Sequence, residues 1–282
     1  MKTMVFSSNI YNIPRNILVL MGASVLLFLP TYQYLISFIW TQEQYSHGAI
    51  IPIIFIWLMW RNYPLIVKSS TKPDLLFGSI LLITGLVLLI IGRRASLPLF
   101  ETFAQIPYIL GLVLILKGRL AASYLRFPLF FLLFMVPLPG IVIYALTSAL
   151  KDWSAYVVVE FFYNLGYPVA RDGVIILIGQ YQLFLADACS GINSIYALSA
   201  LGLLFIYLAK GRSTRRKIAM AIMVVPIAIF SNLVRIGLIL FITYYFGDSV
   251  ANQLHELLGF AIFIVAFAIL FFIEKWLLEL KR

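Results

Sequence analysis

The feature that most constrains this sequence is a series of apolar runs, each near the length needed to cross a membrane. About twenty consecutive apolar residues span the hydrocarbon core as a helix. Eight runs approach this pattern, approximately at residues 17–39, 48–60, 75–92, 106–116, 127–150, 192–210, 218–246 and 259–277. The chain is 63% hydrophobic and 11% charged, which leaves too little polar surface for a soluble domain. We therefore predict an all-α, polytopic membrane helical bundle of about eight transmembrane helices, forming a single domain over residues 1–282.

Some of these runs carry less regular signals than the others. The second and fourth are short, and whether they fully span stays open at this stage. Pro128, Pro137 and Pro139 predict a kinked helix in the fifth run, which membranes tolerate when neighbouring groups satisfy the freed backbone. The first run is too long for a signal-peptide core and lacks a cleavage pattern, so we expect it to be a permanent span.

The basic residues indicate how the chain crosses the membrane. The loop Lys210–Lys217 holds five basic residues and should be cytoplasmic by the positive-inside rule. Threading the spans outward from it places both termini in the cytoplasm and most acidic residues outside. Arg93 and Arg94 are exceptions on the outer side. We expect a multi-pass protein of the cytoplasmic (inner) membrane.

One external segment has a different character. Two β-rich runs, at residues 174–178 and 181–185, flank Gly179 and Gln180, a pattern typical of a β-hairpin. We predict a short extracytoplasmic hairpin just before the sixth span.

Composition also excludes several functions. The net charge of +10 comes from short loops rather than from a basic patch beside a soluble motif, so we expect no nucleic-acid partner. A single cysteine allows no intramolecular disulfide. Two histidines are too few for an all-histidine metal site. We predict no cofactor and no metal.

Cys189 is a candidate nucleophile because of where it lies. It stands at the start of the sixth span, where Asp187 or Ser190 can cap the helix. A helix N-terminus stabilises a thiolate and lowers the pKa of a thiol. The alternative is a small side chain packed between helices, and sequence alone leaves the two about equal.

Arg235, His255 and His47 are the other candidates. Arg235 lies inside the seventh span, where a guanidinium is costly and usually functional, and Asn232 on the same face could orient it. The alternative is a structural ion pair with Glu256 or Asp187. His255, just before the eighth span, suits proton transfer near neutral pH. His47 is also predicted outside, so position alone does not choose between the histidines.

The loop charges place Cys189, Arg235 and His255 toward one membrane face on three successive helices. A thiol, a base and an oxyanion or carboxylate binder are the minimum set for acyl transfer through a thioester. Because His255 is joined to the Arg235 helix by a short connection, we predict that these two residues lie close together.

Several short motifs resemble the exosortase/archaeosortase family. They are Ala188-Cys-Ser-Gly-Ile192, Asn232-Leu-Val-Arg235, His255 with Gly259, and Tyr45-Ser-His-Gly48 ahead of a Pro52-containing apolar segment. The resemblance implies a membrane transpeptidase in which Cys189, Arg235 and His255 are catalytic. It also implies substrates that are exported proteins with a C-terminal sorting signal: a motif such as Pro-Glu-Pro, a transmembrane helix and a basic tail. The subfamily stays open.

The sequence thus predicts a membrane cysteine peptidase or transpeptidase acting at the outer face, with lipids around it and an amine or water as acceptor. Ser190, Asn232, His47 and Glu256 are supporting candidates. The alternative function is a transporter or flippase for polysaccharide or lipid precursors, in which Arg235 and His255 form an ion relay. Transport gives no reason for a nucleophile, so a requirement for Cys189 discriminates between the two.

Overall fold

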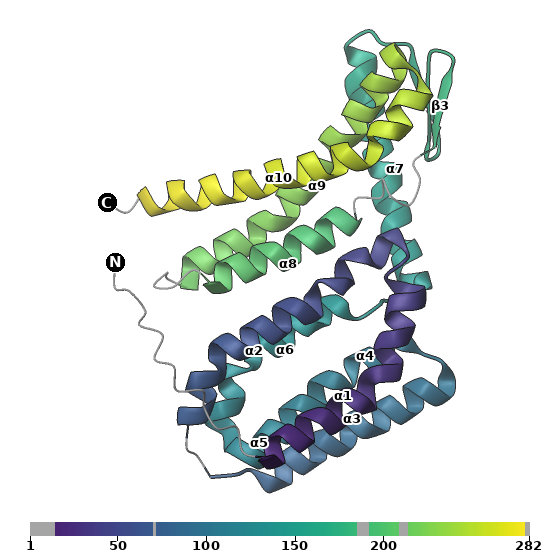
Figure 1. The fold of residues 1–282 in the computed structure, drawn as a ribbon. Helices are drawn as coiled ribbons and strands as arrows, with labels where there is room; N and C mark the ends of the chain where they lie inside the picture. Colours follow the sequence, from purple (N-terminus) through teal and green to yellow (C-terminus); the bar gives the residue numbers. More distant parts are fainter. Residues whose placement is uncertain (1–14, 70–71, 185–191, 209–213, 280–282) are drawn as a thin grey trace.

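A computed structural model describes residues 15–69, 72–184, 192–208 and 214–279 of the chain. These residues form a bundle of helices with one small sheet (Figure 1). The elements are α1 (Arg15–Tyr34), the π-helical turn η1 (Leu35–Ile39), the 3₁₀ helix η2 (Glu43–Ala49), α2 (Ile51–Lys68), α3 (Leu75–Ala95), α4 (Pro98–Phe103), α5 (Gln105–Tyr124), α6 (Arg126–Phe131), the 3₁₀ helix η3 (Leu132–Met135), α7 (Gly140–Asn164), β1 (Val169–Asp172), β2 (Ile175–Ile178), β3 (Tyr181–Phe184), α8 (Ile192–Leu208), α9 (Thr214–Phe246) and α10 (Asp248–Glu279).

The predicted spans appear in order. Within the described residues, six segments are long and apolar enough to cross a membrane: Leu18–Ile39, Tyr45–Lys68, Leu75–Ala95, Pro98–Tyr124, Ile218–Phe246 and Leu257–Lys275. The bent pair of Arg126–Met135 with Gly140–Asn164 and the shorter apolar helix Tyr196–Leu208 account for the other two runs. The second and fourth segments, whose crossing the sequence left open, are 24 and 27 residues long. Both are long enough to span.

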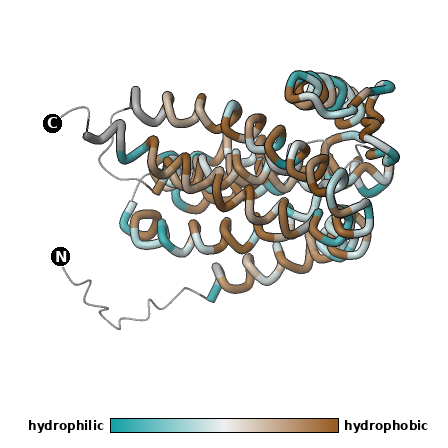
Figure 2. The backbone as a smooth tube through the Cα atoms, turned by 90° about the horizontal axis from the view of Figure 1, so that it is seen from above, coloured by the Kyte–Doolittle hydropathy of each residue, from teal (hydrophilic) through white to brown (hydrophobic). Residues whose placement is uncertain are grey.

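The outside of the bundle is strongly apolar. Figure 2 shows hydrophobic residues along most of the helices and hydrophilic residues mainly near their ends. Large apolar side chains face outward, such as Leu76 (78% exposed) and Phe260 (68% exposed). A soluble protein rarely exposes so continuous an apolar surface, whereas lipid tails cover it without cost.

The fifth run is broken rather than kinked. Residues 126–135 and 140–164 are helical, but the two pieces meet at an angle of 82°. Between them Val136 and Pro139 have extended backbone, with ψ angles of 117° and 139°. Pro137 and Pro139 donate no backbone hydrogen bond and push the preceding residue out of the helical region. The expected single kinked helix over residues 127–150 is therefore replaced by α6–η3, a short linker and α7.

The helices gather in two groups, joined by a middle layer (Figure 1). In the first group α1, α3, α4 and α5 pack around a core that includes Phe28 and Tyr108. In the second, α8, α9 and α10 pack around Leu198, Val224 and Leu270. Between the groups, α2, α6 and η3 pack against α5 and α8. Both faces of α8 are thus covered by described helices.

Glycine permits the closest approach in the first group. A Cβ atom on Gly111 of α5 would lie 2.5 Å from the backbone nitrogen of Leu82 and 2.7 Å from the carbonyl oxygen of Gly78, both in α3. No side chain fits that space. Small residues let membrane helices pack backbone to backbone in this way.

A lobe formed by α7 and the sheet lies against the ends of α9 and α10 (Figure 1). The predicted hairpin is confirmed: β2 and β3 pair antiparallel, with Ile178 opposite Tyr181 and Gly179 at φ +55° in the turn. An additional strand, β1, pairs with β2 to give the order β1-β2-β3. Ile176 and Ile178 are fully buried against α7 and α9. This packing places β3 beside α9. In the sequence, β3 is the last described element before Cys189.

Three arginines near the ends of the spans contact nearby side chains. Arg119 hydrogen-bonds Asp74 at 2.6 Å, and this guanidinium lowers the pKa of the carboxyl, helped by the backbone N–H of Phe77. Arg93, an exception to the loop-charge pattern, lies 3.8 Å from the Glu101 carboxylate. Arg61 lies within α2, with its guanidinium 5.5 Å from the ring centroid of Trp57. Carboxylate and aromatic groups of the chain itself thus contact these three guanidinium groups.

Candidate active site

Arg235 lies deep in the second helix group. It belongs to α9, and only 7% of its surface is exposed. Asn232, one turn earlier on the same helix, is 3% exposed. Burial of a guanidinium in a hydrocarbon environment is unfavourable unless other groups hydrogen-bond to it. The structure supplies such groups from α10.

The predicted proximity of Arg235 and His255 is observed. Arg235 Nη2 lies 3.4 Å from Nδ1 and 3.3 Å from Nε2 of the His255 ring, and it donates to the His255 carbonyl oxygen at 3.3 Å. A guanidinium only donates hydrogen bonds. A ring nitrogen that accepts from it must therefore carry no proton, and the tautomer decides which nitrogen this is. In a neutral ring only one nitrogen can accept from the guanidinium, and this nitrogen must exchange that hydrogen bond for a proton if His255 is to act as a base.

The short turn between α9 and α10 produces this contact. Gly247 joins the two helices with φ +87°, a conformation that glycine adopts without strain. Its N–H donates to the Thr243 carbonyl, and the Ala251 N–H donates to the Gly247 carbonyl. The two helices then run side by side (Figure 1). This arrangement brings His255, near the start of α10, opposite Arg235 of α9.

Gly259 has a role that the sequence motif did not explain. It lies one turn after His255 on α10, and a Cβ atom there would be 3.0 Å from Nη2 and 3.1 Å from Cζ of Arg235. The guanidinium thus lies flat against the glycine backbone. A glycine four residues after a histidine on a helix is a weak signal by itself, because only the position of Arg235 gives it meaning.

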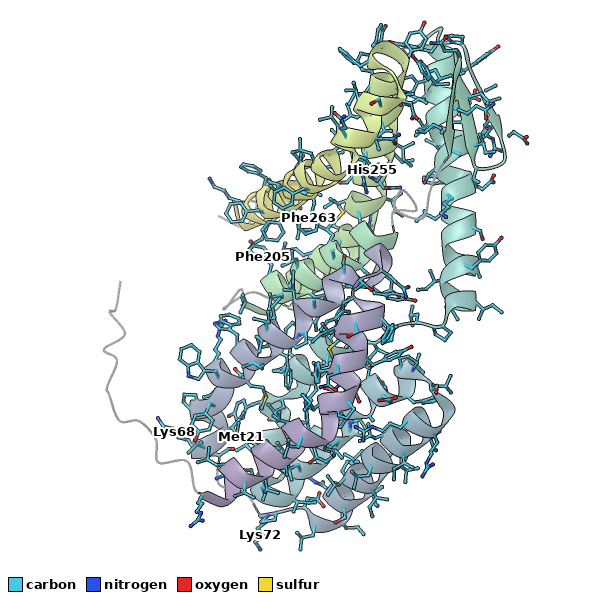
Figure 3. The ribbon with its side chains drawn as sticks, turned by 45° about the vertical axis from the view of Figure 1, so that its right-hand side comes forward. Met21, Lys68, Lys72, Phe205, His255 and Phe263 are labelled. Carbon is cyan, nitrogen blue, oxygen red and sulfur yellow. The ribbon has the colours of Figure 1, made fainter. Side chains whose placement is uncertain are left out.

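Cys189 and Ser190 lie outside the described residues. By sequence, Cys189 follows the last residue of β3 by five positions and precedes the first residue of α8 by three. α8 packs against both α9 and α10. Figure 3 shows His255 on α10 near the beginning of α8. The side chain of Glu256 is also outside the described part, although its backbone belongs to α10.

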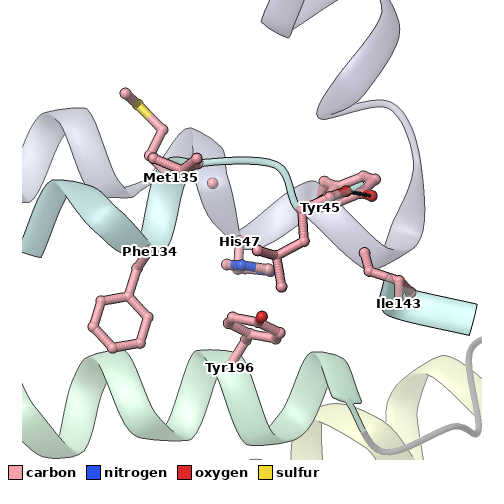
Figure 4. Close-up of a pocket in the computed structure, with 9 residues that line it drawn as sticks. Tyr45, His47, Phe134, Met135, Ile143 and Tyr196 are labelled. Carbon is pink, nitrogen blue, oxygen red and sulfur yellow. Dashed lines mark hydrogen bonds between the residues drawn. The ribbon is translucent and has the colours of Figure 1, made fainter. Parts of the chain in front are cut away.

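His47 is found on a different side of α8. It lies in η2, and its ring stacks on Tyr196 of α8, with centroids 5.6 Å apart and planes 14° apart (Figure 4). The structure therefore brings His255, not His47, to Arg235. Tyr196 was not among the residues that sequence reasoning selected, and no short motif signals it.

The described residues contain no group of three or more His, Cys, Asp or Glu side chains placed to hold a metal ion. The polar groups that do meet are the buried guanidinium of α9 and the imidazole of α10, and the Asn232 amide is buried one turn before the guanidinium. Such a set can bind a carboxylate or a developing oxyanion and can move a proton.

The fold and this site define a multi-pass helical membrane protein with a buried Arg–His pair. A family model described as transmembrane exosortase matches residues 39–272, most of the chain. The chain belongs to the transmembrane exosortase family. Comparison with curated proteins and with solved structures gave no match.

Proposed function

We propose that this protein is a cysteine-dependent transpeptidase that cleaves C-terminal sorting signals of exported proteins. The observation that carries the proposal is the contact between buried Arg235 and His255, in a chain of the exosortase family. The motif cysteine, Cys189, precedes α8, and α8 packs against α9 and α10, the helices that carry Arg235 and His255. No other function weighed for this chain uses all three groups.

The reaction follows from the chemistry of these side chains. His255 takes the proton of the Cys189 thiol, and the sulfur attacks the scissile peptide carbonyl. Negative charge develops on the carbonyl oxygen, where the Arg235 guanidinium stabilises it with directed N–H groups. The tetrahedral intermediate collapses to a thioester, and His255 returns its proton to the leaving amine. That amine departs with the anchor helix of the substrate.

A second nucleophile then completes the cycle. An amine acceptor or water attacks the thioester carbonyl, and His255 accepts the proton that this nucleophile loses. The Cys189 thiolate leaves and is reprotonated. With an amine the product is a new amide, and with water it is a free carboxylate.

The substrate class tests the proposal directly. Co-expression with a tagged protein that ends in a Pro-Glu-Pro motif, an apolar helix and a basic tail should yield a shortened product. Mass spectrometry should show that the apolar helix is lost. Cys189→Ala, at an equal protein level, should leave the substrate intact. Cleavage that persists in this variant would overturn the proposed mechanism and favour a role such as transport.

The proposed location of the chemistry has its own test. With the active site on the outer face of the cytoplasmic membrane, a membrane-impermeant maleimide added to spheroplasts should label Cys189. Cys189→Ala is the control, because the chain has only one cysteine. Labelling that occurs only after permeabilisation would reverse the proposed orientation.

A further inference from the structure

A small cavity lies beside His47, away from the Arg235–His255 pair. Its volume is ≈ 20 Å³ (Figure 4). The lining side chains come from η2, from η3 and the linker after it, and from α7 and α8, and they include Tyr45, Met135, Leu138, Ile143 and Tyr196. A cavity of this size holds about one water molecule or one polar group of a ligand.

The imidazole of His47 has a hydrogen bond at one ring nitrogen, but the structure gives none for the other among the described residues. Its ring stacks on Tyr196, and it makes a hydrogen bond with the backbone of Phe134. Nδ1 is buried and has no hydrogen-bond partner in the described residues. When a neutral ring donates its one N–H to a backbone carbonyl, its other nitrogen is an acceptor. Nδ1 is then an acceptor that lacks a donor.

The surrounding groups do not satisfy this nitrogen. The Tyr45 hydroxyl donates to the carbonyl of Leu138 at 3.0 Å. The Trp40 indole packs onto the backbone at Gly48, where a Cβ atom would be 2.5 Å from Nε1. Buried polar atoms are nearly always hydrogen-bonded, so one without a partner calls for an explanation. A ligand N–H that enters the cavity supplies one.

A larger hollow adjoins this cavity. It has a volume of ≈ 460 Å³ and shares Val136, Leu138 and Tyr196 with the cavity beside His47. Its other lining residues are all apolar: Leu88, Leu99, Phe100, Phe103 and Leu133. Ligand sites commonly have volumes of about 300–1,000 Å³ and combine apolar walls with a few placed polar groups. Here His47 lines the small cavity, and that cavity shares three lining residues with the apolar hollow.

We propose that His47 is a positioning residue for the substrate and that the hollow receives the first apolar side chains of the substrate anchor. His47 Nδ1 accepts a hydrogen bond from a backbone N–H where the substrate chain changes from polar motif to apolar helix. The two cavities match that change in chemistry, because the polar acceptor and the apolar hollow share a wall. This inference rests on the proposed function.

The test uses purified protein in detergent micelles and a synthetic peptide with a Pro-Glu-Pro motif, an apolar segment and a lysine tail. His47→Phe keeps a flat ring against Tyr196 but removes the acceptor. It should raise KM about 10-fold with kcat within about 2-fold, as expected for lost ground-state binding. His47→Asn, whose side-chain carbonyl accepts, should recover part of the KM.

A second variant probes the hollow. Leu133→Trp should fill it and raise KM for the same peptide by about 10-fold. Leu76→Trp is the matched control, because Leu76 is 78% exposed on α3 and lines neither cavity. This control should keep the KM of the unmodified protein.

The possible outcomes are distinct. If the unmodified protein does not cleave the peptide, the proposed function fails and this inference fails with it. If it cleaves and His47→Phe leaves KM unchanged, only the inference is overturned, and the cavity is a site for water. A loss of kcat without a change in KM would also overturn it, by making His47 part of the chemistry. If His47→Asn recovers none of the KM lost in His47→Phe, an acceptor at this position does not restore substrate binding, and the inference is overturned.

Discussion

Two histidines flank α8 from different helices, and their surroundings differ in kind. His255 touches a buried guanidinium, with Arg235 Nη2 at 3.3 and 3.4 Å from its two ring nitrogens. His47 touches an aromatic ring and a backbone group, it lines a small cavity, and its Nδ1 is buried without a hydrogen-bond partner among the described residues. A base in acyl transfer needs a nearby group that stabilises developing negative charge. Among the described contacts of the two histidines, the guanidinium beside His255 is such a group. We therefore assign the two proposed roles, base for His255 and positioning group for His47, from their surroundings rather than from residue type.

Replacing each histidine in turn tests the two assignments. His255→Ala should abolish cleavage, by about 10³-fold or more, because the thiol loses its proton acceptor. His47→Ala should retain a measurable fraction and chiefly weaken substrate handling. The measurement is the ratio of processed to unprocessed substrate on a gel, with enzyme levels equalised. An inactive His47→Ala beside an active His255→Ala would show that the base is assigned to the wrong histidine.

A smaller effect is expected from the cation beside His255. Arg235→Lys keeps the charge but loses the planar set of N–H groups, so activity should fall by about 10²-fold. The variant should still insert, because the positive charge is preserved. Processing should be compared at a matched protein level, measured by blot. Processing close to that of the unmodified protein would mean that Arg235 acts only as a structural counter-ion.

Sequence reasoning succeeded where one local rule decides the structure. Bilayer thickness sets the length of an apolar run, so the order of the apolar segments and their approximate number were predictable. The hairpin follows from Gly179 between two β-rich runs, and the Arg235–His255 contact follows from the short connection at Gly247. These features need no knowledge of distant side chains.

Features that depend on distant contacts could not be predicted. The prolines at 137 and 139 indicated a bend, but the 82° angle is set by the packing of α7 on the sheet and of η3 on α2 and α8. The β1 sequence, Val-Ala-Arg-Asp, has no alternating apolar pattern, and three of its four residues are exposed. The stacking of His47 on Tyr196 joins η2 to α8, and nothing near either residue in the sequence signals it.

A change at Gly259 alters the His255 site without removing a chemical group, so its expected effect is smaller than that of the two preceding variants. A methyl group at Gly259 would meet the guanidinium, with its Cβ 3.0 Å from Nη2 and 3.1 Å from Cζ. Contacts this short force Arg235 to shift by a few tenths of an ångström, which should lengthen its hydrogen bonds to His255. Misplaced catalytic groups lose rate steeply, so Gly259→Ala should lower kcat by about 10-fold.

Gly22→Ala is the matched control, since a Cβ at Gly22 of α1 meets nothing within 4 Å. Both changes replace a helical glycine by a better helix former, so neither should destabilise its helix through propensity. Thermal melting in detergent should therefore agree between the two variants, while their kcat values differ. Equal kcat values would mean that the packing of the guanidinium on α10 does not control its catalytic position. The Arg235–His255 contact would then tolerate displacement in the way expected of a structural pair.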